Sequence, residues 1–535
     1  MKEHYDYVVV GGGSAGCVLA NRLSENGKYT VCLLEAGPED KNMWIHIPIG
    51  YAKTMFDKKV NWGFQTQADP HMNQRSFYWP RGKTLGGCSS INGLIYIRGQ
   101  KQDYDRWGEL GNKGWSWQEC LPYFRKLEDN DLPESETTAK GGPLTATSIP
   151  ANHELVDAFI DSAELNGIPR TRDFNSGDQL GAGYYQLTTK NGLRRSTAVA
   201  YLRPARSRSN LTVKTDALVH RVLFEGNKAV GIELSHKGGP LQRIGANREV
   251  ILSAGAIQSP QILMLSGIGP VEQLKKHDIA VVKALAGVGQ NLQDHLQLRL
   301  MYEVSKPITN NDQLRTVWGK GKIGLQWLLK RSGPLAIGIN QGGAFGYALP
   351  DEAKSPDVQI HFGTLSAEQA GGKVHPFSGC TVSICQLRPE SRGTMHLVDR
   401  DPSTPLAINP NYLSTDLDRR TAIAAVRLAR RIASTGPLGE LLVREHRPGA
   451  ESQSDEQVLE FCRNYGATIF HPSGTAKMGV ASDATAVVDN ELRVYGVQGL
   501  RVVDASIMPT LISGNTNVPV VMIAERASEM ILRNA

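Results

Sequence analysis

A glycine-rich turn near the N-terminus restricts the fold of this chain more than any other feature. The apolar run from Tyr7 to Val10 is typical of a buried parallel strand, and Gly11, Gly13 and Gly16 follow it with the spacing G-x-G-x-x-G. Helical periodicity then continues from Ser14 to Leu23. This order of strand, tight turn and helix predicts the first unit of a parallel α/β sheet that binds a dinucleotide.

The next apolar run, Thr30 to Leu34, ends in Glu35, which is placed to accept hydrogen bonds from a ribose hydroxyl. Free N–H groups at the N-terminus of the intervening helix suit a pyrophosphate. The alternative is a glycine-rich turn without a ligand. It is disfavoured because strand, glycines, helix, second strand and acid all fit within about thirty residues. The motif does not distinguish FAD from NAD.

Composition narrows the class of protein. The 535 residues exceed what one hydrophobic core usually holds, so we expect several domains. The net charge of +6 is spread along the chain, which argues against nucleic-acid binding and mildly favours anionic surfaces or substrates. Seven scattered cysteines without a C-x-x-C motif predict neither a disulfide framework nor a metal site, and they favour a reduced, cytoplasmic protein.

One segment of the sequence is compatible with association of the protein with the inner face of a membrane. The first strand begins within ten residues of the start, which leaves no room for a signal peptide, and no apolar run of about eighteen residues predicts a transmembrane helix. Residues 320–331 (KGKIGLQWLLKR) are short, basic and apolar on one face. Such a segment suits peripheral membrane contact, but we favour an ordinary packed helix.

The pattern of predicted strands and helices divides the chain into three regions that form two domains. Residues 1–295 have the pattern of a Rossmann-like α/β domain, in which the aromatic-rich and aperiodic residues 42–80 are expected to cover the cofactor. Residues 296–463 indicate strands of a mainly antiparallel sheet with helices, an α+β substrate-binding domain. Residues 464–535 return to the nucleotide-binding domain and carry its last strand and helix.

Two longer segments carry a family resemblance. Residues 82–92 (GKTLGGCSSIN) and 255–269 (GAIQSPQILMLSGIG) follow the two signatures of the glucose–methanol–choline (GMC) family of FAD-dependent oxidoreductases. The N-terminal glycines, the pair His471-Pro472 and residues 514–517 fit as well. The chain resembles this family over nearly its whole length. Within the family it looks most like bacterial dehydrogenases of L-sorbose, long-chain alcohols and polyethylene glycol.

The resemblance implies a bound FAD. The residues that it places at the cofactor are Gly11, Gly13, Ser14, Ala15, Gly16, Glu35, Ala36, Arg81, Thr84, Gly87, Asn92, Gly93, Val219, Asp504, Ala505, Asn515 and Thr516. Some members of the family tether the flavin through a histidine at the position held here by Ile91. Isoleucine cannot form that bond, so we expect noncovalent FAD.

Oxidation of an alcohol needs a base for the hydroxyl proton and an acceptor for the hydride. Imidazole suits the first task, because its reference pKa of about 6.5 lies near neutral pH. The resemblance implies that His471 is the base and that Asn515 hydrogen-bonds the substrate oxygen. The alternative roles are a buried histidine bonded to the backbone and a helix N-cap, respectively.

Other candidate residues are weaker. His361 lies on a predicted strand of the substrate domain and is a candidate for lining the pocket. The resemblance implies that Asp294-His295 is structural rather than an acid–base pair, and we expect Cys88 to have a packing role rather than a redox role. The resemblance implies a dehydrogenase of a primary alcohol or polyol that passes electrons to a quinone or another carrier. An O₂-using oxidase and a choline dehydrogenase remain alternatives, followed by a cyanohydrin lyase and a non-catalytic flavoprotein.

Overall fold

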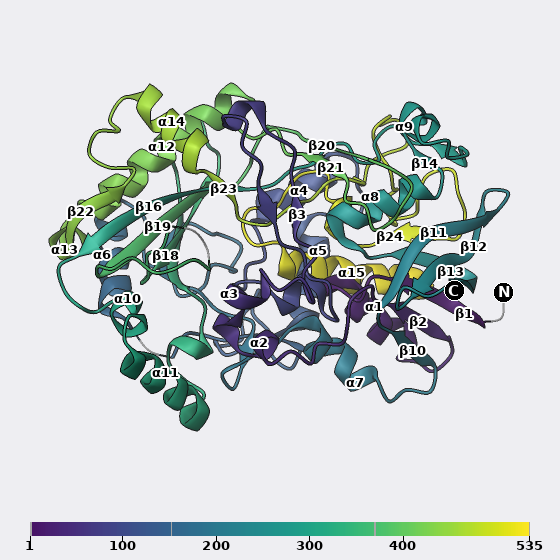
Figure 1. Ribbon diagram of the computed structural model, residues 1–535, viewed down its shortest axis with the longest axis horizontal. Coiled ribbons are helices and arrows are strands. Elements are labelled where there is room, and N and C mark those ends of the chain that lie inside the picture. Colours follow the sequence, from purple (N-terminus) through teal and green to yellow (C-terminus); the bar gives the residue numbers. More distant parts are fainter. Residues whose placement is uncertain (1–2, 151, 369–370, 534–535) are drawn as a thin grey trace.

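Two seven-stranded sheets organise the chain. The computed structural model, which describes residues 3–150, 152–368 and 371–533, places these sheets towards opposite ends of the molecule (Figure 1). In the first sheet the order β10-β2-β1-β13-β24 is parallel, and β12 and β11 continue it antiparallel beyond β13. Its strands are β1 (Glu3–Val10), β2 (Val31–Leu34), β10 (Leu211–Lys214), β11 (Ala217–Glu225), β12 (Lys228–His236), β13 (Leu241–Leu252) and β24 (Leu500–Val502).

The predicted strand–turn–helix unit is present at the start of this sheet. Helix α1 (Ser14–Ser24) follows β1 through the glycine turn, and a Cβ atom on Gly16 would lie 1.8 Å from the carbonyl oxygen of Gly11. Helix α15 (Asn517–Arg533) lies beside α1 (Figure 1). The buried carboxylate of Glu525 on α15 accepts a hydrogen bond of 2.7 Å from Arg22 on α1. The last helix of the chain is therefore fixed to its first.

The second sheet is antiparallel in every pairing between described residues, which confirms the predicted sheet type. Because side chains alternate along a strand, Phe362 stacks on Phe159 of α6 (Glu154–Leu165), while His361 faces the opposite side. Helix α12 (Asp416–Ala433) also packs on this sheet. The strands are β7 (Gly181–Tyr184), β16 (Leu296–Val304), β17 (Asn340–Gly346), β18 (Val358–Gly363), β19 (Gly379–Gln386), β22 (Leu442–Arg447) and β23 (Ala467–Thr468).

The predicted boundaries at residues 295 and 463 remain a proposal, because the sheets do not follow chain order strictly. β7 and α6 belong to the second layer although they precede residue 295, and β23 pairs with β16 although it follows residue 463. Apart from α11 (Val317–Lys330), the remaining α-helices of four or more residues are α2 (Met43–His46), α3 (Tyr51–Thr54), α4 (Lys101–Glu109), α5 (Trp117–Leu127), α8 (Gly255–Leu265), α9 (Val271–Lys276), α10 (Asn310–Leu314), α13 (Gly436–Leu441) and α14 (Asp455–Tyr465).

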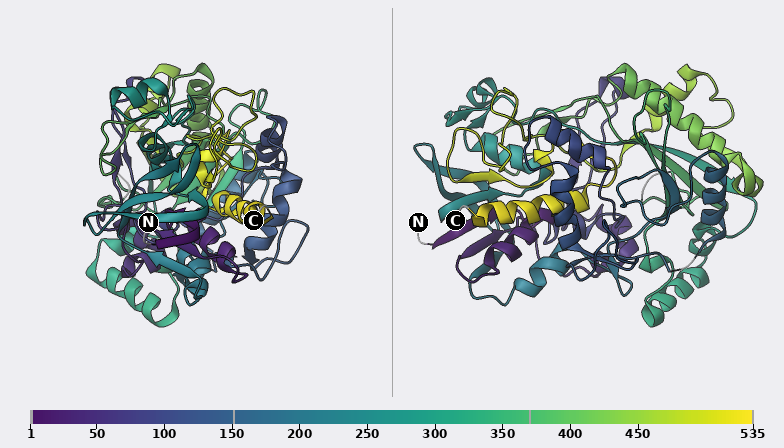
Figure 2. Two further views of the ribbon diagram at one scale, coloured as in Figure 1. Left: turned by 90° about the vertical axis from the view of Figure 1, so that its right-hand side faces the viewer. Right: turned by 180° about the vertical axis from the view of Figure 1, so that it is seen from behind.

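Helix α11 (Val317–Lys330) projects from the second layer, at the lower left of Figure 1 and the lower right of the rear view in Figure 2. We expected an ordinary packed helix here, and that expectation is wrong. Only Ile323 and Trp327 are buried, whereas Trp318 is 90% exposed and Leu329 is 73% exposed. None of the helices in the described part of the chain is both long and apolar enough to cross a bilayer.

Candidate active site

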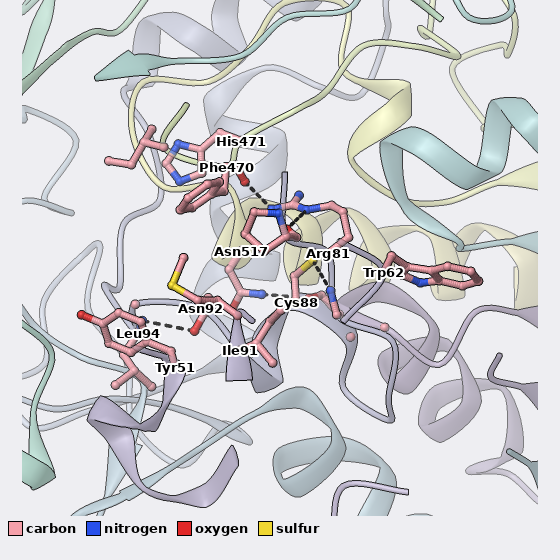
Figure 3. A pocket seen from close by; sticks show the side chains of 18 of the residues that line it. Tyr51, Trp62, Arg81, Cys88, Ile91, Asn92, Leu94, Phe470, His471 and Asn517 are labelled. Carbon is pink, nitrogen blue, oxygen red and sulfur yellow. Dashed lines mark hydrogen bonds between the residues drawn. The ribbon is translucent and has the colours of Figure 1, made fainter. Parts of the chain in front are cut away.

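A cavity of about 830 Å³ lies between the two sheets. Its lining includes the carboxyl ends of β1 and β2 on one side and residues of β16, β18 and β19 on the other. Residues 44–62, from the segment expected to cover the cofactor, contribute several further lining side chains. Figure 3 shows His471 and Phe470 above the loop that carries Cys88, Ile91 and Asn92.

The end of the cavity at the glycine turn has the features that a dinucleotide requires. Helix α1 begins after Gly13 without a side-chain cap, so its first N–H groups are free to meet a phosphate. A Cβ atom on Gly87 would lie 2.7 Å from the Cα of Gly13, so only glycine fits between the two loops. The carboxylate of Glu35 faces the cavity and accepts hydrogen bonds from the N–H groups of Gly12 and Gly37. These residues fit an adenosine diphosphate moiety such as that of FAD.

The cavity gathers most of the residues that the sequence assigned to the cofactor. Those that line it are Gly11, Gly13, Ser14, Ala15, Glu35, Ala36, Arg81, Gly87, Asn92, Gly93, Val219, Asp504, Ala505, Asn515 and Thr516. Gly16 and Thr84 do not line it. Gly16 lies beneath the turn, and Thr84 is buried, with its hydroxyl donating to the Pro38 carbonyl at 2.9 Å. Both shape the loops without facing the cavity.

Asn92 belongs to a loop whose conformation depends on a residue that the sequence did not single out. The guanidinium of the buried Arg194 donates to Asn92 and to the carbonyls of Ile45 and Pro48. Burial lowers the pKa of Arg194 to about 9. Arg194 is one of two consecutive arginines, and nothing in the sequence marks it for this role.

His471 follows a strained turn that three side chains hold in place. Phe470 has φ +71, a left-handed conformation that costs free energy in a bulky residue. The N–H of His471 donates to the carboxylate of Asp294 at 2.7 Å, and Arg81 donates to the Phe470 carbonyl at 2.6 Å. Thr468 completes the set, since its hydroxyl accepts from the Phe470 N–H and donates to Asp294. Asp294 is thus structural, as the sequence indicated.

Hydrogen bonds fix the tautomer of His471. The Nε2 atom of His295 lies 2.9 Å from the carbonyl oxygen of Leu387, which can only accept, so this nitrogen carries the proton. The Nδ1 atom of a neutral His295 is then an acceptor, and it lies 3.0 Å from Nδ1 of His471. His471 therefore donates through Nδ1, and its Nε2 atom is unprotonated and can act as an acceptor.

The orientation of Asn515 is fixed in the same manner. The hydroxyl of Tyr185 donates to the Ile360 carbonyl, so its oxygen accepts from the side-chain amide of Gln359. The same amide donates to Oδ1 of Asn515 at 3.2 Å. The NH₂ group of Asn515 consequently points at Nε2 of His471, at 3.4 Å. Asn515 precedes α15 by two residues, so it is a polar contact of the cavity rather than a helix cap.

The surroundings of His471 keep its imidazole neutral. Burial is the main cause that lowers the pKa of His471, and the neighbouring His295, His361 and Arg81 lower it further. Burial likewise lowers the pKa of His295 to about 4. A neutral ring with an unprotonated Nε2 atom is the form that a general base needs. Neither His295 nor Gln359 was assigned this positioning role from the sequence, because their contacts span 176 and 156 residues.

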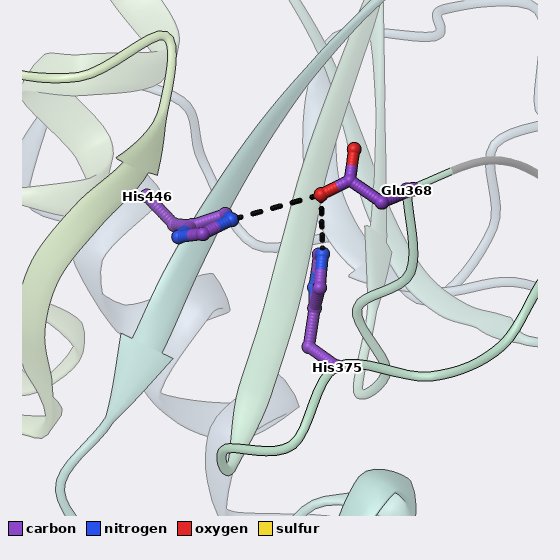
Figure 4. A group of neighbouring side chains, drawn as sticks. All are labelled: Glu368, His375 and His446. Carbon is purple, nitrogen blue, oxygen red and sulfur yellow. Dashed lines mark hydrogen bonds and ion pairs between the residues drawn. The ribbon is translucent and has the colours of Figure 1, made fainter.

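One group of side chains in the described residues has the spacing of metal ligands. Ligand atoms of Glu368, His375 and His446 lie within 4.8 Å of one another (Figure 4). Arg447 pairs with the same carboxylate, and its charge opposes a bound cation. His375 and Arg447 lower the pKa of Glu368 to about 2. We interpret the group as an anchor for the segment that contributes Ala367 and Val374 to the cavity wall.

Comparison with known proteins identifies the family. The N-terminal model of the GMC oxidoreductases matches residues 5–297, and the C-terminal model matches residues 389–524. Mitochondrial choline dehydrogenase of Mus musculus is 44% identical over 99% of this chain and 90% of its own length. Alcohol dehydrogenase [acceptor] of Pseudomonas putida is 42% identical over 99% and 96%, respectively.

Solved structures agree with this result. Pyridoxine 4-oxidase from Mesorbium loti has a TM-score of 0.88 and 32% identity, with 98% of each chain covered. Formate oxidase has a TM-score of 0.93 and 27% identity, covering 99% of this chain and 98% of its own. The chain therefore belongs to the glucose–methanol–choline family of FAD-dependent oxidoreductases, enzymes that act on a CH–OH group of their donor.

Proposed function

We propose that this protein is a dehydrogenase of primary alcohols or polyols in which His471 is the catalytic base. One observation carries the proposal: the lone pair on Nε2 of His471 and the NH₂ group of Asn515 meet at the cavity, with their nitrogen atoms 3.4 Å apart. A substrate hydroxyl that approaches both groups from the cavity replaces their direct contact: it donates its proton to Nε2 and accepts a hydrogen bond from the NH₂ group. Both groups then bind the same oxygen.

Proton removal at this oxygen raises the electron density on the carbinol carbon, which favours loss of hydride. FAD, when bound, supplies the hydride acceptor. The residues of this chain contribute the base, the orientation of the substrate and the cradle of the cofactor. Thr516 and the start of α15 line the same cavity, so the positive end of this helix dipole faces it.

The electron acceptor forms the second part of the proposal. A quinone or another carrier is supported by the relative from Pseudomonas putida, whose name specifies an acceptor. We propose a cytoplasmic enzyme with noncovalent FAD, because Ile91 faces the cavity at the position where a tethering histidine would stand. An oxidase would instead release peroxide in air, and this measurement separates the two enzyme types.

Choline is the second candidate substrate, because several relatives at 40–44% identity are named choline dehydrogenases. The charges of the cavity disfavour it. Among the described lining residues the carboxylates are Glu35 and Asp504, and both accept hydrogen bonds from the protein at the predicted cofactor site. Neither is left to pair with a trimethylammonium group.

Anaerobic reduction of the bound flavin tests the proposal. Purified holoenzyme is mixed with sorbose, sorbitol, linear alcohols, glycol ethers, aryl alcohols and choline, and the loss of the flavin absorbance is followed. We expect alcohols or polyols to bleach the flavin and His471→Ala to abolish most bleaching while FAD stays bound. Bleaching by choline alone would establish the second candidate, and a flavin that no alcohol bleaches would exclude both.

A further inference from the structure

An arginine without an acidic partner faces the cavity from the second sheet. Arg299 on β16 lines the cavity, and its Nε atom donates to Gln297 at 3.1 Å. No carboxylate in the described part of the chain forms an ion pair with its guanidinium. Burial lowers the pKa of Arg299, which shows that the protein environment disfavours this charge as long as it stays unpaired.

Two further polar groups stand beside Arg299. It is the cross-strand partner of Ser383 on β19, and Ser383 is in turn the partner of His361 on β18, so the three side chains lie in a row on one face. All three line the cavity. His361 is completely buried, and neither of its ring nitrogens has a hydrogen-bond partner in the protein. A neutral imidazole has one N–H donor and one acceptor nitrogen, and a ligand in the cavity would satisfy both.

Away from the cofactor end, the charged side chains that line the cavity are cationic, like Arg299. Its lining includes the cationic side chains of Lys53, Arg81, Arg299 and Lys320, whereas both lining carboxylates lie at the cofactor end. Of these cations Arg299 is the one on the sheet face that also carries His361. His361 in turn lies close enough to His471 to lower its pKa. The row is therefore near the reactive end of the substrate.

We infer that Arg299, Ser383 and His361 form a subsite for an anionic group, so that the preferred substrate is an alcohol that also carries a carboxylate. This inference rests on the proposed function, since the alcohol group of the same molecule binds both His471 and Asn515. The guanidinium forms the ion pair, and an N–H of His361 and the hydroxyl of Ser383 supply further donors. The subsite repels choline for the same reason.

Matched pairs of substrates test the subsite. Short ω-hydroxy acids from glycolate to 6-hydroxyhexanoate are compared with the diols of equal length in anaerobic flavin reduction. We expect the best hydroxy acid to exceed its diol by about 10- to 100-fold in kcat/KM, the effect of one charge-assisted interaction. Arg299→Gln should remove this preference, Arg299→Lys should keep part of it, and Arg172→Gln, at an exposed arginine, should leave it unchanged.

A binding measurement separates this inference from the proposed function. Butanoate carries the anionic group without an alcohol, and its dissociation constant is read from the change that it causes in the flavin spectrum. We expect Arg299→Gln to raise this constant by about tenfold or more. If diols and hydroxy acids react equally and Arg299→Gln leaves butanoate binding unchanged, the subsite is wrong. If no alcohol bleaches the flavin, the proposed function fails, and butanoate binding alone decides the subsite.

A second observation, independent of the first, concerns the outer face of α11. At about 100° per residue, Val317, Trp318, Leu325, Leu328 and Leu329 fall within an arc of about 120°. All five are among the exposed large apolar side chains, from 57% exposed at Leu325 to 90% at Trp318. The two buried residues of the helix lie on the opposite side. A contiguous apolar face of this kind marks an interaction site.

The charges around this face are complementary to an anionic surface. Lys320, Lys322, Lys330 and Arg331 are all exposed, and α11 itself contains no acidic residue. Lys320, Ile323 and Gly324 also line the cavity, so one side of the helix faces the cavity and the opposite side carries the exposed apolar residues. Cationic side chains beside exposed Trp and Leu are the pattern of a helix that lies in the interface of an anionic bilayer.

We propose that α11 docks the protein on an anionic lipid surface and brings the cavity to the lipid, within reach of a lipid-soluble electron acceptor. Sedimentation of holoenzyme with vesicles tests it. We expect binding to vesicles that contain phosphatidylglycerol, weaker binding to phosphatidylcholine alone, and loss of binding at high salt. The fluorescence of Trp318 should shift to shorter wavelength on binding.

Matched variants decide the source of binding. L325S/L329S and K322Q/K330Q should each lower vesicle binding by about tenfold or more, since burial of two leucines or about 1 kcal/mol per lysine is lost. Activity with a water-soluble alcohol and dye should not change. Leu165→Ser and Leu241→Ser, at exposed leucines on α6 and β13, serve as controls. Unchanged binding in L325S/L329S, or a dimer in solution that this variant dissociates, would refute the proposal.

Discussion

The Nδ1 atoms of His295 and His471 lie 3.0 Å apart, and the carbonyl of Leu387 at the far side of His295 decides which of them carries the proton. The tautomer of the proposed base is thus fixed by a backbone carbonyl that it does not contact and that acts through His295. A second chain of hydrogen bonds, which starts at the Ile360 carbonyl, fixes Asn515. Both polar groups of the site therefore depend on carbonyls at the second sheet.

Replacement of His295 should damage catalysis without loss of cofactor. His295→Leu removes the acceptor for Nδ1 of His471, so the ring can rotate or adopt the other tautomer. We expect kcat/KM to fall by about tenfold or more, a part of the about 10²- to 10⁴-fold that a positioned base contributes. His295→Gln, which retains an acceptor oxygen, should recover some activity. Steady-state kinetics and FAD content are measured, with His220→Gln, at a histidine that bonds Ser235, as the control.

His471→Ala should lower kcat by about 10²- to 10⁴-fold while the protein remains yellow. In the wild type, burial holds the pKa of His471 well below the ordinary histidine value, so the neutral base persists as the pH falls. The acidic limb of the profile of kcat/KM against pH should therefore lie below about 6.5. A limb at or above this value, or a variant with near-normal turnover, would contradict the assignment.

Binding of FAD should strengthen as the pH rises from about 6 to about 8. Burial raises the pKa of Glu35 to about 7 in the protein without cofactor, so much of this carboxyl is protonated at neutral pH. Ribose hydroxyls donate to the ionised form, so the cofactor selects it and binding releases a proton. Titration of apoprotein with FAD at several pH values measures the effect. Glu35→Gln should bind more weakly and with no such pH dependence.

Gly16→Ala should prevent normal assembly of the first strand–turn–helix unit. The added Cβ atom would lie 1.8 Å from the Gly11 carbonyl oxygen, so helix and strand must separate. We expect a lower thermal midpoint and loss of FAD, since overpacking of this kind costs about 1–3 kcal/mol or more. Gly321→Ala, on α11 with no atom within 4 Å of the added Cβ, should leave both quantities nearly unchanged.

Features that depend on neighbouring residues could be predicted from the sequence. The glycine turn, α1 and the strand before it followed from local periodicity and the conformational freedom of glycine. The family models confirm the resemblance to the GMC family. That resemblance identified His471, Asn515 and most of the predicted cofactor residues, and the structure places them at one cavity.

Tertiary structure alone decided how distant groups meet. The sequence of α11 predicts an apolar face, but it does not show whether another element of the fold covers that face or leaves it exposed. The same holds for Arg299, which lines the cavity, and for His295 and Gln359, which bond the side chains of His471 and Asn515. In the sequence all three are ordinary polar residues. Periodicity encodes the direction of a side chain relative to its own element. The partner of that side chain depends on the fold of the whole chain, which local sequence does not contain.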